Sequence, residues 1–321
     1  MTEVVTILGE TMQAVRVHAF GGPDAMVIET VPRPEPREGE ILVQVKAAGV
    51  GPWDGWVRSG KSVIDQPLPL TPGSDIAGIV AAVGPNTEGF AVGEAVYGVT
   101  NRRFTDGYAE YAVAQAGMMA GKPESLSFIE AASVPVIAVT AWQALFEQAR
   151  AAAGQTVLIH GAAGNVGAYA VQMARAAEAE IIATAGTDDL AFVESLGADR
   201  VIDYRAERFD QVLNDVDVVI DLVGGETQVR SFSVLKPGGY LISAVSKPDE
   251  ALAVAHKVQA HFFLVDVTTM ELTRIAEMID AGELKTQIGL TMKLADVRRA
   301  HRILDGEEPA PRGKIVLEVA D

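Results

Sequence analysis

Short runs of alternating hydrophobic and polar residues fill the N-terminal part of the chain. Residues 41–46 (ILVQVK), 76–83 and 95–99 are typical of these runs, and glycine or proline residues separate them. Such runs, with turn residues roughly every eight to twelve positions, are typical of an antiparallel sandwich or barrel. We therefore expect an all-β domain over residues 14–120.

The period of the pattern changes near residue 127. Ser127 and Glu130 have the spacing of a capping box, which predicts the start of a helix that Pro135 interrupts. Beyond residue 155, apolar strands alternate with helical patterns, which predicts parallel βαβ units in a doubly wound α/β sheet with helices on both faces. The strands are expected at residues 156–160, 180–185, 201–204, 217–223, 240–245 and 262–265, and helices at 166–177 and 188–196.

The last part of the chain changes character again. Two amphipathic helices are expected at about 268–281 and 294–304, followed by a closing strand at 314–319. We expect this segment to return to the first domain. The predicted organisation is a substrate domain over residues 1–130, a dinucleotide-binding domain over 131–266, and a C-terminal segment over 267–321 that completes the first domain.

Composition narrows the class of protein. The 321 residues are 49% hydrophobic, no apolar run reaches the roughly 18 residues of a membrane span, and the N-terminus lacks the features of a secretory signal. We expect a globular, cytoplasmic protein that does not span a membrane. The formal net charge of −17 disfavours nucleic acid as a partner, because it repels the phosphate backbone.

The chain contains no cysteine. Disulfides, thiolate nucleophiles and cysteine-ligated zinc sites are therefore excluded. The five histidines are scattered without the spacing of metal ligands, and no metal site is predicted. His160 is interpreted as a packing residue at the end of a strand.

Residues 157–167 (VLIHGAAGNVG) combine an apolar strand, a turn of small residues and the start of a helix. Small residues let the backbone approach a pyrophosphate, and the N-terminus of the helix offers free N–H groups and the positive end of its dipole. The spacing is Ala162-x-Gly164-x-x-Gly167, so alanine replaces the first glycine of the usual fingerprint. A purely structural turn is the alternative, but the strand before and the helix after favour nucleotide binding.

The end of the second strand indicates which dinucleotide is bound. An acidic side chain there would accept a hydrogen bond from the ribose 2′-hydroxyl of NADH and repel a 2′-phosphate. Residues 183–187 (ATAGT) contain no acid, which favours NADPH. Asp188 and Asp189 follow, without a neighbouring Lys or Arg in the sequence, and are interpreted as the first turn of a helix capped by Thr187. NADH therefore stays an alternative.

Motifs across almost the whole chain resemble the zinc-free quinone oxidoreductase branch of the medium-chain dehydrogenase/reductase superfamily. Each motif is common, but their order and spacing together are specific. They are residues 47–50 (AAGV), 72–78 (PGSDIAG), 83–84 (VG), 89–90 (GF), 92–93 (VG), 107–111 (GYAEY), 140–142 (TAW), 161–167 (GAAGNVG), 195–199 (SLGAD), 221–225 (DLVGG), 236–239 (KPGG) and 313–317 (GKIVL).

The resemblance implies an N-terminal GroES-like β domain, a Rossmann domain, a cleft between them where nicotinamide meets substrate, and a homodimer. Zinc-dependent relatives carry Cys, His and Cys where this chain has Gly51, Ser74 and Val136, and their four-cysteine lobe is missing between Tyr97 and Gly107. The resemblance therefore implies chemistry without zinc. A quinone or an activated enone suits such chemistry, because its own π system accepts the hydride.

The resemblance also implies a set of cofactor contacts. The contacts implied near the pyrophosphate and the nicotinamide ribose are Thr140, Ala163, Gly164, Asn165 and Val166, and those around the adenosine ribose are Gly186, Thr187 and Tyr204. The contacts implied at the strand ends are Leu222, Val223, Ser243, Val245 and Phe263, and the one in the returning strand is Lys314. Several have a plainer interpretation. Val223, Val245 and Phe263 could belong to the core, Tyr204 could lie on the surface, and Lys314 could be a solvated charge.

The chain departs from the family pattern where the substrate is expected. Relatives typically read Gly-Val-Asn-Pro-x-Asp with a Tyr two residues later, and this chain has Gly51 for the Asn and Trp56 for the Tyr. Gly51, Trp53, Asp54 and Trp56 are the pocket candidates. The tryptophans could stack on a flat substrate or belong to the core, and a structural turn role is expected for Asp54. No general acid is assigned, and Asp221 is interpreted as the cap of a turn.

The function predicted from these observations is hydride transfer from NADPH to a quinone or an activated enone, without zinc. Two alternatives stay open. One is a reductase of enoyl thioesters. The other is a catalytically weak nicotinamide-binding sensor or structural protein, which the replacement of polar pocket residues by Gly51 and Trp56 would suit.

Overall fold

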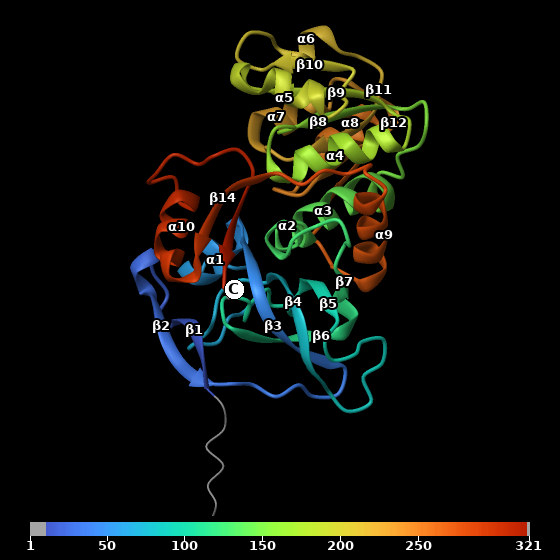
Figure 1. The fold of residues 1–321 in the computed structure, drawn as a ribbon. Coiled ribbons are helices and arrows are strands. Elements are labelled where there is room, and N and C mark those ends of the chain that lie inside the picture. Colours follow the sequence, from blue (N-terminus) through green and yellow to red (C-terminus); the bar gives the residue numbers. More distant parts are fainter. Residues whose placement is uncertain (1–10, 320–321) are drawn as a thin grey trace, which may run out of the picture. The chain divides into compact units, whose positions relative to one another are not determined.

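The structure is a computed structural model that describes residues 11–319 (Figure 1). The chain forms two compact units. Unit 1 contains the described residues up to Pro135, Val267–Ala276 and the described residues from Thr286 on; unit 2 contains Val136–Asp266 and Glu277–Lys285. The last turn of the helix Thr269–Asp280 thus belongs to unit 2. The sequence-based division expected all of residues 267–321 to complete the first domain.

Unit 1 is built on a seven-stranded sheet in the order β14-β15-β3-β4-β5-β7, with β6 paired to β3. A separate two-stranded sheet joins β1 and β2 in antiparallel register. Val43, Val45, Ile76 and Val96 lie in the core of this unit. The strands are β1 (Thr11–Val17), β2 (Met26–Pro32), β3 (Glu40–Val50), β4 (Asp75–Val83), β5 (Ala95–Val99), β6 (Tyr111–Gln115), β7 (Met119–Gly121), β14 (Ile288–Lys293) and β15 (Lys314–Glu318).

The C-terminal segment completes this sheet, as predicted. β15 pairs antiparallel with β3, with Leu317 opposite Ala48, so the red end of the ribbon runs beside blue β3 in Figure 1. β14, which the sequence did not predict, adds a parallel edge strand to β15. The helices of unit 1 are α1 (Pro52–Ser59), α2 (Phe128–Ala132), α10 (Val297–Leu304) and the first part of α9 (Thr269–Asp280).

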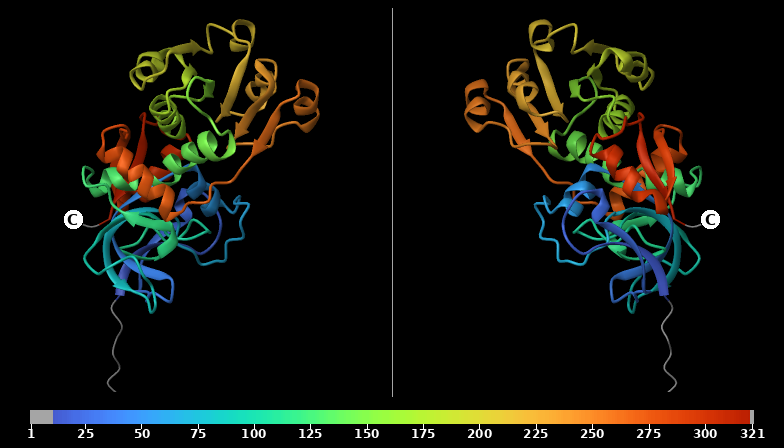
Figure 2. Two further views of the ribbon diagram at one scale, coloured as in Figure 1. Left: turned by 90° about the vertical axis from the view of Figure 1, so that its right-hand side faces the viewer. Right: turned by 90° about the vertical axis from the view of Figure 1, so that its left-hand side faces the viewer.

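Unit 2 contains a six-stranded parallel sheet in the order β10-β9-β8-β11-β12-β13. This order, which runs outward in both directions from β8 and β11, is that of a doubly wound dinucleotide-binding sheet. Figure 2 shows the helices packed around its strands. The strands are β8 (Thr156–His160), β9 (Glu180–Ala185), β10 (Arg200–Asp203), β11 (Val216–Asp221), β12 (Leu235–Ser243) and β13 (Gln259–Phe262).

The helices of unit 2 follow its strands in alternation. α2, which belongs to unit 1, begins as predicted, because Ser127 accepts from the Glu130 N–H. α3 begins at Pro135, where the pyrrolidine ring suits the first turn of a helix. A π-helical turn, Gln143–Gln148, continues α3. The helices of this part of the chain are α3 (Pro135–Trp142), α4 (Asn165–Ala176), α5 (Leu190–Ser195), α6 (Phe209–Val212), α7 (Gly225–Ser231) and α8 (Glu250–His256).

The predicted α/β class, with a Rossmann sheet and a β domain completed by the C-terminus, is confirmed. Two local predictions are wrong. The last parallel strand is β13 at 259–262 rather than 262–265. Thr187 does not cap a helix through its side chain: it begins a 3-10 turn, Thr187–Asp189, and its hydroxyl donates to Asp203 Oδ2 at 2.6 Å. No helix among residues 11–319 is long and apolar enough to cross a membrane.

Candidate active site

The loop over residues 161–167, called the cofactor loop below, joins β8 to α4. Gly161 has φ +71°, a conformation that suits glycine, and Gly164 is the N-cap of α4. A Cβ atom on Gly167 would lie 2.2 Å from the Gly161 carbonyl oxygen, so helix and strand approach too closely for any side chain there. The first intrahelical bond runs from the Ala168 N–H to the Gly164 carbonyl at 2.9 Å.

The N-terminus of α4 offers backbone donors. The first N–H groups of a helix have no intrahelical acceptor, and here they belong to Asn165, Val166 and Gly167. Ala163, Gly164, Asn165 and Val166 all retain solvent exposure, and the loop carries no acidic side chain. These features fit the pyrophosphate of a dinucleotide, because N–H groups and the helix dipole favour an anion.

The cofactor loop lies at the switch point of the sheet. β8 and β11 are neighbours, with His160 opposite Asp221, and the chain leaves them toward opposite edges. A Cβ atom on Gly161 would lie 3.3 Å from Val223 and 3.4 Å from Leu222, so both predicted residues adjoin the loop. A doubly wound sheet binds its ligand at this point, outside the carboxyl ends of the strands.

Asp221 fixes the turn after β11. It is fully buried, and its carboxylate accepts from the N–H groups of Val223 (3.0 Å) and Gly224 (2.8 Å). The other oxygen accepts from the Gln228 amide at 2.9 Å and the Ser243 hydroxyl at 3.0 Å. The turn role predicted for Asp221 is confirmed, and the Ser243 side chain is engaged with Asp221 rather than free for a ligand.

Four other predicted contacts have different surroundings. Val245 and Val223 are about half exposed, at 47% and 54%, so the core interpretation is wrong for both. Phe263 directly follows β13 and donates its N–H to the Ser243 carbonyl at 3.3 Å. Thr140 is buried in α3, and its hydroxyl donates to the Val136 carbonyl at 2.7 Å.

The carboxyl ends of β9 and β10 bring a cation to the predicted ribose position. Tyr204 is 58% exposed, and a Cβ atom on Gly186 would lie 3.3 Å from its hydroxyl and 3.5 Å from the Arg205 guanidinium. Arg205 lies 5.8 Å from the centre of the Tyr204 ring and 3.5 Å from the Asp188 carboxylate. The sequence analysis found no basic residue here, because Arg205 becomes a neighbour only once β9 and β10 pair.

His160 behaves as a packing residue, as predicted. Its ring is fully buried, contacts Phe209, and exchanges hydrogen bonds with the hydroxyls of Thr184 (2.9 Å) and Ser231 (3.1 Å). Burial lowers the pKa of His160 to about 4, because the charged imidazolium is poorly solvated there. The neutral ring holds the ends of β8 and β9 together.

In unit 1, four buried residues form the group called the polar cluster below: Asp54, Asp75, Tyr108 and Lys314. Lys314 Nζ lies 2.9 Å from Asp75 Oδ2, and only 2% of the lysine is exposed. The interpretation of Lys314 as a solvated charge is therefore wrong. A Cβ atom on Gly51 would lie 3.1 Å from Nζ, so the absence of a side chain at Gly51 leaves room for the ammonium group.

Asp54 occupies the N-terminus of α1 inside this cluster. Its Oδ2 accepts from the Gly51 N–H at 2.8 Å and from the Tyr108 hydroxyl at 2.9 Å, which supports the structural role expected for it. Burial raises the pKa of Asp54 to about 7, against the opposing effects of Lys314 and the Gly51 N–H. Burial and the Asp54 charge raise the pKa of Tyr108 well above its ordinary value.

The two tryptophans of α1 differ. Trp53 is partly buried and lies 5.4 Å from Phe104, whereas Trp56 is 49% exposed. Their rings meet edge to face at 5.9 Å. Trp53 is thus largely a packing residue, and Trp56 is the one that offers an indole face to a ligand.

No group of three or more His, Asp or Glu side chains that could hold a metal ion occurs within residues 11–319.

Comparison with known proteins shows which family the chain belongs to. Residues 37–135 match the alcohol dehydrogenase GroES-like domain and residues 196–317 match the zinc-binding dehydrogenase family. Human quinone oxidoreductase is 32% identical over 324 residues, 95% of this chain and 97% of its own. The chain belongs to the quinone oxidoreductase branch of the medium-chain dehydrogenase/reductase superfamily.

Solved structures of this branch agree with the assignment. The quinone oxidoreductase from Coxiella burnetii superposes with a TM-score of 0.88 at 31% identity, covering 97% of this chain and 100% of its own. A mycobacterial protein solved with NADPH gives a TM-score of 0.83 at 29% identity, covering 96% and 99%. This member of the branch is therefore an oxidoreductase that uses a nicotinamide cofactor, as predicted.

Proposed function

We propose that this oxidoreductase transfers a hydride from NADPH to a quinone or an activated enone. The observation that carries the proposal is the cofactor loop at the switch point of the sheet, in a chain of the quinone oxidoreductase branch. The NADPH-dependent alkenal/one oxidoreductase of Arabidopsis thaliana, 32% identical over 83% of this chain and 69% of its own, supports an enone acceptor. Both acceptor classes take the hydride into a conjugated π system.

The proposed preference for NADPH rests on the residues around Gly186. No acid ends β9, and the Arg205 guanidinium lies beside Gly186 next to the exposed Tyr204. In such sheets this is where a ribose 2′-hydroxyl or 2′-phosphate is recognised, and an arginine accommodates the phosphate. Asp188 opposes this preference, but its ion pair with Arg205 at 3.5 Å partly neutralises it.

The proposed zinc independence rests on the sequence. The chain has no cysteine, and Gly51, Ser74 and Val136 stand where zinc-dependent relatives are expected to carry ligands. When bound, NADPH supplies the hydride, and the side chains of this protein need only hold the cofactor and the acceptor. Asp54 is buried and engaged with Gly51 and Tyr108, so we propose that water protonates the reduced product.

We also propose a homodimer formed through the cofactor domains. β13 is the edge strand of the six-stranded sheet, and its carboxyl-terminal half contains exposed His261. An unpaired strand edge can extend a sheet across a two-fold axis. Sedimentation of the wild-type protein and of an Ala260→Pro variant, which removes an edge N–H, tests this proposal: a dimer that the variant weakens supports it, and a wild-type monomer contradicts it.

The reaction is tested by mixing purified protein with NADPH and then adding benzoquinone, a conjugated enone or an enoyl thioester in separate samples. We expect loss of the reduced-nicotinamide absorbance with benzoquinone or the enone. Turnover with the thioester alone would replace the proposal by an enoyl-thioester reductase. Tight cofactor binding without turnover of any acceptor would favour the sensor alternative.

A further inference from the structure

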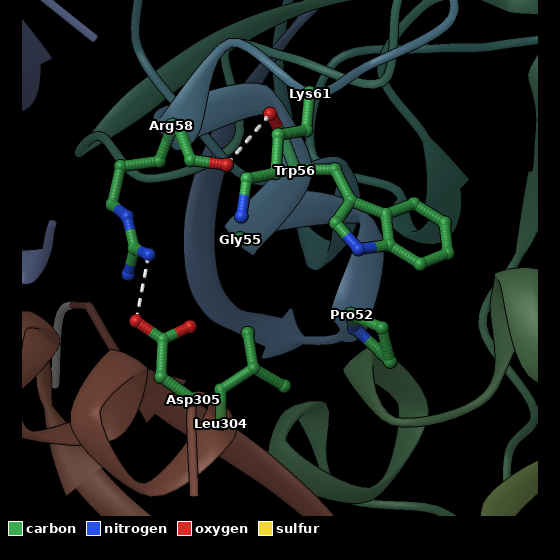
Figure 3. Close-up of a pocket in the computed structure, with 8 residues that line it drawn as sticks. Pro52, Gly55, Trp56, Arg58, Lys61, Leu304 and Asp305 are labelled. Atoms are coloured by element: carbon green, nitrogen blue, oxygen red, sulfur yellow. Dashed lines mark hydrogen bonds and ion pairs between the residues drawn. The ribbon is translucent and has the colours of Figure 1, made fainter. Parts of the chain in front are cut away.

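A pocket of about 330 Å³ lies in unit 1 between α1 and the end of α10 (Figure 3). This volume is at the lower end of the range for small-molecule sites. The pocket has one aromatic wall, one aliphatic contact and several polar groups. Its lining residues are Pro52, Gly55, Trp56, Arg58, Ser59, Lys61, Leu304 and Asp305.

One face of α1 forms the floor of the pocket. Pro52, Gly55, Trp56 and Ser59 are spaced at three or four residues, so they share that face. Gly55 contributes no side chain, and a Cβ atom there would lie 3.3 Å from Leu304 Cδ2. The indole of Trp56 stands at one side of this open floor with about half of its surface exposed (Figure 3).

The charges in the pocket leave one cation available. Arg58 is 3% exposed, and its guanidinium donates to the Gly21 carbonyl, to His301 Nδ1 and, at 2.7 Å, to Asp305 Oδ2. Arg58 and Asp305 therefore neutralise one another and join α1 to α10. Lys61 is exposed, and no ion pair of its ammonium group is found in the part of the chain that the structure describes, residues 11–319.

Backbone bonds fix Lys61 next to Trp56. Gly60 ends α1 in the left-handed conformation at φ +74°, where a Cβ atom would lie 2.8 Å from the Phe20 ring. The Lys61 N–H donates to the Trp56 carbonyl at 2.8 Å, and the Ser59 hydroxyl donates to the same carbonyl at 3.3 Å. The residues that carry an aromatic face, a hydroxyl and an available ammonium group therefore share the last turn of α1 and its C-terminal end.

We propose that this pocket binds a planar aromatic anion, such as an aromatic carboxylate or sulfonate. The ring system lies against the Trp56 indole over Gly55, and the anionic group meets the Lys61 ammonium. Two kinds of ligand share this chemistry. The ligand is either an acceptor that carries an acidic substituent, which rests on the proposed function, or an aromatic acid that is not reduced, which does not.

Binding is tested by ligand-observed NMR titration of the full-length protein with naphthoate, and with the neutral naphthalene methanol as the matched ligand. Trp56→Leu should weaken naphthoate binding about two- to tenfold, as expected for an aromatic contact. Lys61→Gln should weaken it about two- to fivefold and leave the neutral ligand unchanged. Lys236→Gln is the control and should change neither, because Lys236 lies in unit 2, where it is partly exposed and pairs with Asp217.

Gly55→Leu tests the pocket by filling it. The residue is helical, so leucine suits its backbone, and we expect naphthoate binding to fall at least about tenfold with NADPH binding unchanged. Lys61→Gln keeps the test decisive if Gly55→Leu does not fold, because Lys61 is on the surface. Absence of naphthoate binding to the wild type at millimolar concentration, or equal binding to the wild type, Trp56→Leu and Lys61→Gln, overturns the proposal.

Steady-state kinetics separate the two kinds of ligand. If the ligand is an acceptor, Lys61→Gln raises KM for naphthoquinone sulfonate and not for naphthoquinone itself. If it is an unreduced aromatic acid, both KM values stay unchanged while naphthoate binding weakens. Failure of every quinone and every activated enone to be reduced would contradict the proposed function and leave the NMR result on this pocket intact.

Discussion

The cofactor loop of unit 2 and the polar cluster of unit 1 are built in different ways. The loop acts through backbone N–H groups and the absence of side chains at Gly161, Gly164 and Gly167. The cluster acts through side chains, and its closest ion pair joins Asp75 to Lys314, residues 239 positions apart. A local sequence pattern can therefore specify the first, whereas only tertiary structure assembles the second.

The largest expected effect comes from removing one charge of the polar cluster. Lys314→Met leaves Asp75 buried without the ammonium that lies 2.9 Å away, which should lower the free energy of unfolding by about 3–5 kcal/mol. The double variant Asp75→Asn/Lys314→Met should recover much of this loss, because no uncompensated charge remains. Urea unfolding measures both, and equal stability of Lys314→Met and wild type would contradict the pairing.

The second largest effect is a pH dependence of stability that comes from Asp54 in the polar cluster. The folded-state pKa of Asp54 is raised to about 7, so the folded protein binds a proton there that the unfolded chain releases near its ordinary value of 3.8. The bound proton stabilises the fold by on the order of 2–4 kcal/mol. This contribution to the free energy of unfolding is fully present below about pH 4 and is lost as the pH rises through 7. Asp54→Asn should remove it.

Urea unfolding of wild type and Asp54→Asn at about pH 5 and pH 8 checks this sign. We expect the variant to gain stability relative to wild type on going to the higher pH. Comparing the two proteins cancels the opposite contribution of His160 and His301, whose folded pKa values are lowered to about 4 and about 3 and which destabilise the fold in acid. If the difference in free energy of unfolding between wild type and Asp54→Asn were the same at both pH values, the prediction would be contradicted.

The cofactor loop should fail when a single methyl group is added. Gly167→Ala places Cβ against the Gly161 carbonyl and Ala162, which should cost about 1–3 kcal/mol of stability and weaken NADPH binding at least tenfold. Gly117→Ala, where a Cβ atom meets nothing within 4 Å, is the matched control. Thermal unfolding and NADPH titration measure the two effects, and unchanged NADPH affinity of folded Gly167→Ala would remove the loop from the site.

The smallest expected effect concerns the choice between cofactors. Arg205→Gln should weaken NADPH binding about three- to tenfold and leave NADH unchanged, because only NADPH carries the 2′-phosphate. Arg208→Gln, whose guanidinium pairs with Asp210 at 2.6 Å, is the matched control. If Arg205→Gln weakened both cofactors equally, the role assigned to the guanidinium would be wrong.

What could be predicted from the sequence follows from this contrast. The bounds of β8 and β9 and the start of α2 at Ser127 were correct, because local periodicity and capping determine them. Arg205 was missed, because its place beside Gly186 depends on the pairing of β9 with β10. Strand order in a doubly wound sheet was the signal that could have found it.

The surroundings of α1 were the least predictable. Gly51 and Trp56 departed from the family pattern, but the sequence did not reveal that Gly51 makes room for Lys314, or that Trp56 faces a pocket while Trp53 packs on Phe104. These relations depend on segments that are distant in the chain. The chemistry of a site that is built from side chains can therefore be predicted only once the fold is known.

The most direct test of the central claim is a fluorescence titration of the purified protein with NADPH and, separately, with NADH. The account predicts saturable binding of both cofactors, with NADPH bound more tightly and with that preference reduced in Arg205→Gln. Absence of binding of either nucleotide at millimolar concentration would contradict the assignment of the loop over residues 161–167 as the cofactor site.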